Sequence, residues 1–441
     1  MMKYYLATYG CQMNEYDSAM IASMLEDVGY YETENAEDAD VILVNTCSVR
    51  KKAEDNIYAR ISQLKPLKQS NPDLRIAVLG CMAENHGAKI TDTLKHVDFV
   101  VGPDQYRGLV DILALPPSKS PHRQQPKSVL VGFDSAENYD DNFAKILSPF
   151  STHITIQRGC NKRCAYCIVP FTRGIEKFRP VESILAEVQK AVDKGVKEIS
   201  LLGQTVNSYR YEGNSFANLL SKVAEIKGVE RLRFTSPHPR HYTDELLWVL
   251  THTPQISPHT HLPLQSGSND ILKSMRRQYD SEDFLAIVEY LRASDPFYGV
   301  TTDIIVGFTG ETEEDYLQTL EVVKHAQFDH AFMFAYSPRE GTEAFDWPDS
   351  ISEAEKHRRL QKLIDLQNEI TRQRSQNMIG REEKVLIERP SPKNPEEWMG
   401  KTGNFKNVAL PADFSPQAGD IVTAKITEVR GWTLRGEAIN L

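Results

Sequence analysis

Short apolar runs alternate with longer amphipathic segments along the first 110 residues of the chain. Buried-strand patterns cover residues 3–10, 40–46 and 75–80, and helical periodicity follows. Three successive strand–helix units predict a mostly parallel, doubly wound sheet. A cysteine follows each run: Cys11, Cys47 and Cys81.

The placement of these three cysteines is the same on three separate strands. In doubly wound sheets, ligands bind beyond the carboxyl ends of the strands, so we expect the three thiols to meet there. Three thiolates can hold a four-iron cluster and leave one iron open. The alternative is that three unrelated small residues are simply buried, and the identical placement favours the metal centre.

Six further strand patterns alternate with helices in the middle of the chain. They cover residues 153–157, 198–202, 231–235, 259–264, 299–306 and 330–336. About six such units predict a partial or complete parallel barrel, whose active site belongs at the carboxyl ends of its strands.

The loop after the first of these strands carries Cys160, Cys164 and Cys167. One bend of backbone can aim three sulfurs spaced this closely at a single centre. Three thiolates would again leave one iron of a four-iron cluster free to hold a small molecule. The alternative is a zinc site or buried thiols, but no histidine follows at finger spacing and no fourth cysteine is near.

The pattern changes twice more along the chain. Prolines and polar residues at 115–128 predict a loop, and residues 352–380 predict a long helix with Ser352 and Glu355 as a capping box. Short strands broken by proline and glycine follow at residues 384–388, 407–410, 421–426 and 433–438, which is typical of a small β-barrel. We therefore expect three domains, at residues 1–145, 146–377 and 378–441.

Composition limits the class of protein. Six cysteines in 441 residues, with a mean hydropathy of −0.44, fit a globular protein with metal or redox chemistry. No apolar run reaches the roughly 20 residues that span a bilayer and no signal peptide is evident, so we expect a cytoplasmic protein without a membrane partner.

The net charge of −10 argues against a surface that attracts nucleic acid as a whole. Contacts with RNA would need local cationic groups. The candidates are Arg50-Lys51-Lys52, Arg276-Arg277 and the cations of the 352–380 helix, although each alone is more typical of a solvated face.

The cysteine loop also carries a family resemblance. Cys-x-x-x-Cys-x-x-Cys after a strand resembles the signature of radical S-adenosylmethionine enzymes. The longer run GCNKRCAYCIVPFTRG at residues 159–174, with YGCQMNEYDS at residues 9–18, resembles the methylthiotransferases, and among them the MiaB type. The resemblance covers essentially the whole chain, and the C-terminal segment resembles a TRAM domain, a module associated with RNA binding.

The resemblance implies two [4Fe-4S] clusters, a radical cluster on Cys160, Cys164 and Cys167 and an auxiliary cluster on Cys11, Cys47 and Cys81. It implies methylthiolation of tRNA, in which N6-(dimethylallyl)adenosine at position 37 gains a 2-methylthio group. One S-adenosylmethionine would donate the methyl group and a second would supply the radical. The implied partners are the anticodon stem-loop of tRNA and an electron donor such as flavodoxin or ferredoxin, and the enzyme is expected to be a monomer.

Individual cofactor contacts follow from strand order and from the resemblance. The candidates for S-adenosylmethionine are Tyr166, Gly203, Gln204, Ser236, Gln265 and Val306, and the candidates for substrate are Arg173 and Arg277. Gln204 stands where the superfamily often has an acidic residue that receives the amino group. A structural turn at Gln204, and ordinary loop polarity at Ser236 and Gln265, are the alternatives.

Three other functions are alternatives to methylthiolation of N6-(dimethylallyl)adenosine in tRNA. Within the family, the acceptor could be an aspartate of a ribosomal protein or threonylcarbamoyladenosine in tRNA. The residues of the motifs at both triads favour N6-(dimethylallyl)adenosine in tRNA over these two. From a different class, a non-enzymatic RNA-binding protein could hold structural zinc on the same cysteines. Colourless, iron-free protein after anaerobic purification would favour that last function.

Overall fold

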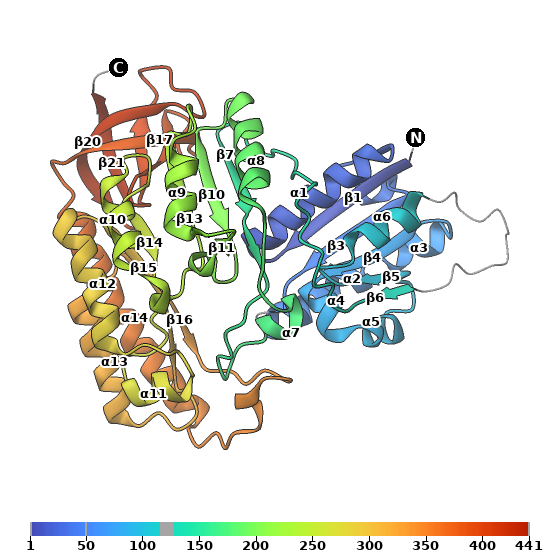
Figure 1. The fold of residues 1–441 in the computed structure, drawn as a ribbon, viewed down its shortest axis with the longest axis horizontal. Coiled ribbons are helices and arrows are strands. Elements are labelled where there is room, and N and C mark those ends of the chain that lie inside the picture. The colour runs from blue at the N-terminus through green and yellow to red at the C-terminus, as the bar shows by residue number, and fades with distance from the viewer. Residues whose placement is uncertain (1, 49–50, 115–127, 440–441) are drawn as a thin grey trace.

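The computed structural model describes residues 2–48, 51–114 and 128–439, arranged as three parts in sequence order (Figure 1). The predicted loop at 115–128 and the cationic group at 50–52 lie almost wholly outside the described side chains. None of the described helices is long and apolar enough to cross a membrane.

The N-terminal part is a six-stranded sheet in the order β2-β1-β3-β4-β5-β6, and every pairing in it is parallel. Its strands are β1 (Met2–Tyr9), β2 (Tyr30–Glu32), β3 (Val41–Thr46), β4 (Arg75–Gly80), β5 (Phe99–Val101) and β6 (Ser128–Leu130). Its helices are α1 (Gln12–Asp27), α2 (Lys51–Ser62), α3 (Lys65–Ser70), α4 (Cys81–His86), α5 (Ala88–Thr93) and α6 (Tyr106–Ala114).

Helices bury both faces of this sheet, and neighbouring strand residues point to opposite faces. Leu43 packs in one cluster with α1 and α6, whereas Val44 packs in the other with Ile57 and Ile61 of α2. Burial on both faces explains the continuous apolar runs in the sequence. The predicted doubly wound sheet is confirmed.

The central part has six parallel strands that form two adjacent sheets, β13-β10-β7 and β14-β15-β16. They are β7 (Ser151–Thr155), β10 (Glu198–Leu202), β13 (Arg231–Phe234), β14 (His259–His261), β15 (Gly299–Val306) and β16 (His330–Ala335). A parallel bridge between Leu232 of β13 and Ile256, three residues before β14, links the two sheets. The result is a partial barrel, as the six strand patterns predict.

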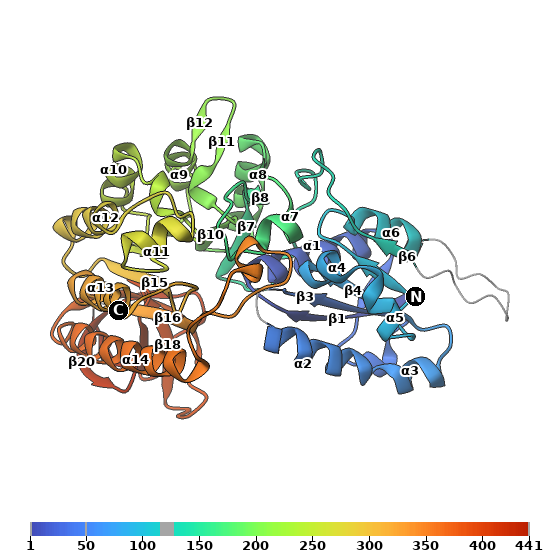
Figure 2. The ribbon, with the colours of Figure 1, turned by 90° about the horizontal axis from the view of Figure 1, so that it is seen from below.

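Helices cover the outside of this partial barrel (Figure 2). They are α8 (Val181–Asp193), α9 (Phe216–Ala224), α10 (Asp244–His252), α12 (Ser281–Ser294), α13 (Glu313–Ala326) and α14 (Glu353–Gln376), with shorter α7 (Val169–Arg173) and α11 (Asn269–Ser274). Two small ribbons, β8 (Gln157–Arg158) with β9 (Lys177–Phe178) and β11 (Arg210–Tyr211) with β12 (Asn214–Ser215), flank the strand ends. The Ser352 hydroxyl caps α14 by accepting from the Glu355 amide at 3.2 Å, whereas the Glu355 carboxylate accepts from Arg358 and Arg359, so only half of the predicted capping box forms.

The C-terminal part is a closed five-stranded barrel in the order β17-β18-β19-β21-β20. Its strands are β17 (Glu382–Pro390), β18 (Glu397–Thr402), β19 (Asn407–Pro411), β20 (Ile421–Arg430) and β21 (Thr433–Ile439). Arg231, at the start of β13, donates to the carbonyl oxygens of Lys401 and Lys384 at 2.8 and 2.6 Å. This barrel therefore packs against the amino-terminal ends of the central strands and leaves their carboxyl ends to the site.

Candidate active site

The three N-terminal cysteines lie at one edge of their sheet. Parallel pairing aligns Tyr9 with Thr46, and Thr46 with Gly80, the last residues of β1, β3 and β4. Cys47 and Cys81 come directly after these strands, and Cys11 comes two residues after β1, at the start of α1. Three thiols separated in sequence are thus brought to adjacent strand ends, as the strand pattern predicts.

The surroundings of this triad favour the thiolate at Cys11, whereas burial opposes it at Cys81. A hydrogen bond with Cys47 lowers the pKa of Cys11 to about 6, although burial opposes the shift. Burial raises the pKa of Cys81, but the positive charge of Arg173 acts against this rise. The Nε of Arg173 donates to Cys81 Sγ at 3.0 Å. Thiolate is the form of cysteine that binds metal.

The second triad lies on the loop that follows β8. The Cys160 amide donates to the carbonyl of Gly174 at 3.0 Å, and the Cys167 amide closes a turn onto the Cys164 carbonyl at 3.0 Å. Cys160 and Cys164 are buried and Cys167 is partly exposed. Burial raises the pKa of Cys167 to about 12. The Nη1 of Arg277 lies 3.4 Å from Cys164 Sγ as a donor.

The donor sets of both triads fit iron–sulfur clusters. Each offers three soft sulfur ligands, and each has one buried guanidinium that donates to a thiol sulfur. Arg173 Nη2 is buried without a hydrogen-bond partner. Within residues 2–48, 51–114 and 128–439, no group of three or more His, Cys, Asp or Glu side chains is placed to share a single metal ion. In a cluster, each thiolate binds its own iron.

Glutamine side chains brace the base of the second triad. Gln204 Oε1 accepts from the Gly159 amide at 2.6 Å, and Gln157 Oε1 accepts from the Gln204 amide at 2.8 Å. A Cβ at Gly203 would come within 2.6 Å of Gln157 Oε1, which shows how closely these two segments pack. The Oε1 atom of Gln204 is therefore bonded to the cysteine loop. Contact of Gln204 with S-adenosylmethionine stays a prediction.

The other predicted cofactor residues lie at or near the carboxyl ends of the strands. Tyr166 packs edge-on against Phe308, with ring centroids 6.3 Å apart, and Val306 is the fully buried last residue of β15. Gln265, four residues after β14, forms backbone hydrogen bonds with Asp303 and Ile305 of β15. Exposed Ser236 follows β13 by two residues. The structure thus gathers these residues at one end of the partial barrel, and their contacts with cofactor stay predictions.

The two arginines predicted to face substrate are buried beside the thiols. Arg173 is 4% exposed and Arg277 is 6% exposed, and they contact Cys81 and Cys164. Sequence position could not reveal these contacts, because Arg173 reaches the thiol of a different part of the chain. Their contact with substrate stays a prediction.

The structure also identifies residues that the sequence patterns missed. Asp17 of α1 is fully buried and pairs with Arg158 at 2.8 Å and Arg173 at 2.6 Å. Arg158 comes two residues before Cys160, and Arg173 comes six residues after Cys167. One carboxylate of the N-terminal part therefore holds both flanks of the second cysteine loop. The YGCQMNEYDS run contains Asp17, which is the only signal in the sequence.

Two cations of the 352–380 helix are wrongly predicted as RNA contacts. Lys356 is 1% exposed and pairs with Asp349 at 2.5 Å, and Arg359 is 5% exposed and pairs with Glu311 at 2.7 Å. Both are buried because α14 packs against β16 and α13, where carboxylates neutralise them.

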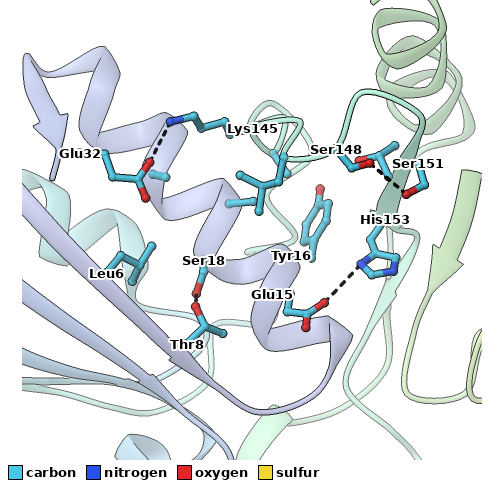
Figure 3. Close-up of a pocket in the computed structure, with 15 residues that line it drawn as sticks. Leu6, Thr8, Glu15, Tyr16, Ser18, Glu32, Lys145, Ser148, Ser151 and His153 are labelled. Carbon is cyan, nitrogen blue, oxygen red and sulfur yellow. Dashed lines mark hydrogen bonds and ion pairs between the residues drawn. The ribbon is translucent and has the colours of Figure 1, made fainter. Parts of the chain in front are cut away.

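A cavity of about 490 Å³ lies at the junction of α1, β1 and β7 (Figure 3). In this view Glu15 of α1 points toward His153 of β7, and their side chains lie 3.8 Å apart. Lys145 similarly reaches Glu32 at 2.9 Å. None of the predicted site residues is among the described residues that line this cavity. Glu15 and His153 pair across the junction, so the cavity belongs to the contact between the first two parts.

Models of known families match three segments of the chain. "Uncharacterized protein family UPF0004" matches residues 3–102, the "Radical SAM superfamily" residues 154–323, and the "TRAM domain" residues 376–439. The chain is 42% identical to the tRNA-2-methylthio-N(6)-dimethylallyladenosine synthase of Thermoanaerobacter sp., over 99% of this chain and 93% of that protein. It is 41% identical to the synthase of the same name from Moorella thermoacetica, over 99% and 98% of the two chains.

The chain belongs to this synthase family.

Membership of the family confirms the predicted resemblance to radical S-adenosylmethionine methylthiotransferases of the MiaB type, and with it that the chain is an enzyme. Such an enzyme uses an iron–sulfur cluster and S-adenosylmethionine. Among solved structures, the radical S-adenosylmethionine methyltransferase TsrM from Kitasatospora setae shares the fold, with a TM-score of 0.58 and 12% identity over 78% of this chain and 74% of that one. OxsB, a cobalamin-dependent radical enzyme, aligns with a TM-score of 0.52 and 16% identity over 85% and 56% of the two chains.

We expect Gly159→Ala to slow reductive cleavage of S-adenosylmethionine by roughly 10²-fold, because it displaces the cysteine loop. Gly159 has a φ of +75°, and a Cβ there would lie 1.9 Å from the Ile175 carbonyl oxygen. Formation of 5′-deoxyadenosine measures the rate. The matched control is Gly195→Ala, which also has a positive φ, of +90°, but whose Cβ would meet no atom within 4 Å. Equal rates for the two variants would contradict this account.

Proposed function

We propose that this enzyme converts N6-(dimethylallyl)adenosine at position 37 of tRNA to its 2-methylthio derivative, using two S-adenosylmethionine molecules. The observation that carries the proposal is the pair of thiol triads, one at the ends of three adjacent strands and the other on a single loop. The names of the full-length relatives support the substrate. We propose one [4Fe-4S] cluster on each triad, with one open iron in each.

We further propose three domains, at residues 1–145, 146–377 and 378–441. The boundaries are supported by the change from the parallel sheet to the partial barrel, and then to the closed barrel. In this arrangement the first domain presents Cys11, Cys47 and Cys81, and the second presents the loop of Cys160, Cys164 and Cys167. The third domain would hold RNA, in keeping with its match to the TRAM model.

The reaction replaces an aromatic C–H that has no acidic proton, so a general base is of little use and a radical is needed. When bound, the cluster on the loop would supply the electron that cleaves S-adenosylmethionine, and the auxiliary cluster would hold the sulfur. The protein's own residues orient these centres. Gln157 and Gln204 hold the base of the loop, and Arg158 and Arg173 tie its two flanks to Asp17.

The proposed partners follow from this reaction. The substrate is the anticodon stem-loop of tRNA, with the target base turned out of its stack into the space between the two triads. A flavodoxin or ferredoxin would supply the electrons in the cytoplasm, and the enzyme would act as a monomer.

The test is anaerobic quantification of iron and sulfide, alongside mass spectrometry of nucleosides. Reconstituted protein is incubated with S-adenosylmethionine, dithionite and tRNA that carries the isopentenyl group. We expect about eight irons per chain and a new 2-methylthio nucleoside. Eight irons without product on this tRNA would redirect the search to threonylcarbamoyladenosine or to the ribosomal protein. Iron-free, zinc-loaded protein would overturn the proposal.

A further inference from the structure

Arg173 reaches from the second cysteine loop into the first cysteine site. It is the last residue of α7, which lies beside α4 at the junction of the two parts in both views (Figures 1 and 2). Helix α4 begins with Cys81. The guanidinium is 4% exposed, and its Nε donates to Cys81 Sγ at 3.0 Å. The Nη1 donates to Asp17 Oδ2 at 2.6 Å, and Nη2 is buried without a partner.

The buried charges at this junction do not cancel. Asp17 is a single carboxylate, and it faces both Arg173 and Arg158, whose side chains are 4% and 3% exposed. Tyr106 also donates to Asp17, at 3.4 Å, and brings no charge at neutral pH. Two guanidinium groups against one carboxylate leave a net positive charge next to Cys81. A charge held away from water acts strongly on its neighbours.

A cluster with three thiolate ligands is anionic, and adding an electron makes it more so. Hydrogen bonds to the ligand sulfurs and nearby positive charge both favour the reduced state. We propose that Arg173 raises the reduction potential of the auxiliary cluster. It does so through its hydrogen bond to Cys81 and through the uncompensated positive charge that it shares with Arg158. This inference rests on the proposed function, because it requires a cluster on Cys11, Cys47 and Cys81.

The second triad provides a matched case within the same chain. Arg277 is 6% exposed and donates to Cys164 Sγ at 3.4 Å. Its other donors reach the Tyr279 hydroxyl and the Pro263 carbonyl. No carboxylate is among the hydrogen-bond and ion-pair partners found for Arg277 in the described part of the chain. Each triad thus has its own guanidinium, which permits a crossed experiment.

The experiment follows one-electron reduction of each cluster separately. In the full-length chain, the triple variant C160A/C164A/C167A retains only the auxiliary site, and C11A/C47A/C81A retains only the radical site. Arg173→Gln and Arg277→Gln are introduced into both backgrounds. Each reconstituted protein is reduced stepwise with dithionite at controlled potential, and electron paramagnetic resonance measures the reduced fraction.

We expect R173Q to shift the auxiliary cluster to a more negative potential. At the midpoint potential of its parent, the ratio of reduced to oxidised cluster should fall by roughly tenfold. R277Q should leave that cluster unshifted and instead shift the radical cluster. Arg173→Lys keeps the positive charge but has fewer hydrogen-bond donors, so its midpoint potential should lie between those of R173Q and the parent. It also tests the proposal if R173Q folds poorly.

The outcomes separate this inference from the proposed function. An auxiliary cluster that assembles in R173Q and R173K with the midpoint of its parent would overturn the inference alone. A shift of equal size from R277Q would also overturn it, because the effect would then be unspecific. Absence of any cluster in the C160A/C164A/C167A parent would overturn the two-cluster proposal.

Discussion

Replacing Cys11, Cys47 and Cys81 together by alanine should abolish the methylthio product while cleavage of S-adenosylmethionine persists. The reason is spatial. These thiols lie at the ends of β1, β3 and β4, whereas the loop of Cys160, Cys164 and Cys167 belongs to the central barrel and is braced by Gln157 and Gln204. Iron content should fall by about half, since one cluster of two is lost. Mass spectrometry of nucleosides and formation of 5′-deoxyadenosine measure the two activities.

The control is the reciprocal variant C160A/C164A/C167A, which should lose both activities and also retain about half of the iron. The two triple variants would then differ only in cleavage of S-adenosylmethionine. Loss of that cleavage in a folded, half-iron C11A/C47A/C81A protein would contradict the division of roles between the triads.

Replacing Asp17 by alanine should destabilise the protein by about 3–5 kcal/mol, because it leaves two buried guanidinium groups without their carboxylate. Asp17 has no exposed side-chain area, and Arg158 and Arg173 have 3% and 4%. Unfolding in urea, followed by circular dichroism on protein without iron, measures the change. The effect should be larger than that of most single substitutions.

An exposed ion pair supplies the control for this measurement. Glu369 and Arg372 lie 2.7 Å apart, with side chains 59% and 56% exposed. Glu369→Ala should therefore change the free energy of unfolding by less than about 1 kcal/mol. If D17A and E369A unfold at the same urea concentration, the junction does not depend on Asp17.

The strand ends could be predicted from the sequence because their signals are local. Apolar runs fix the strands, and parallel pairing then places Cys47 and Cys81 on one edge without further information. The six strands of the central barrel followed from the same signals. Residues such as Ser236 and Gln265 could be placed at the carboxyl ends for the same reason, whereas the contacts of their side chains could not.

The contacts that the sequence did not reveal all cross between elements. Arg173 is close to Cys167 in sequence, yet it reaches Cys81 because α7 packs against α4. Lys356 looks like a solvated helical cation, and its burial depends on how α14 lies against the barrel. A Cβ on Gly307 would come within 2.5 Å of Lys356 Cγ, which shows how closely the two segments approach. Local patterns carry no information about such packing.

The two triads differ in how they can be inherited. The loop of Cys160, Cys164 and Cys167 is one continuous peptide, so a recombination event could move it whole onto another scaffold. Cys11, Cys47 and Cys81 exist as a group only when three strands pair in register, so the shortest segment that carries them runs from β1 to Cys81. A short peptide moved to another scaffold would therefore carry the complete second triad, whereas the first triad needs the whole segment from β1 to Cys81, folded as a sheet.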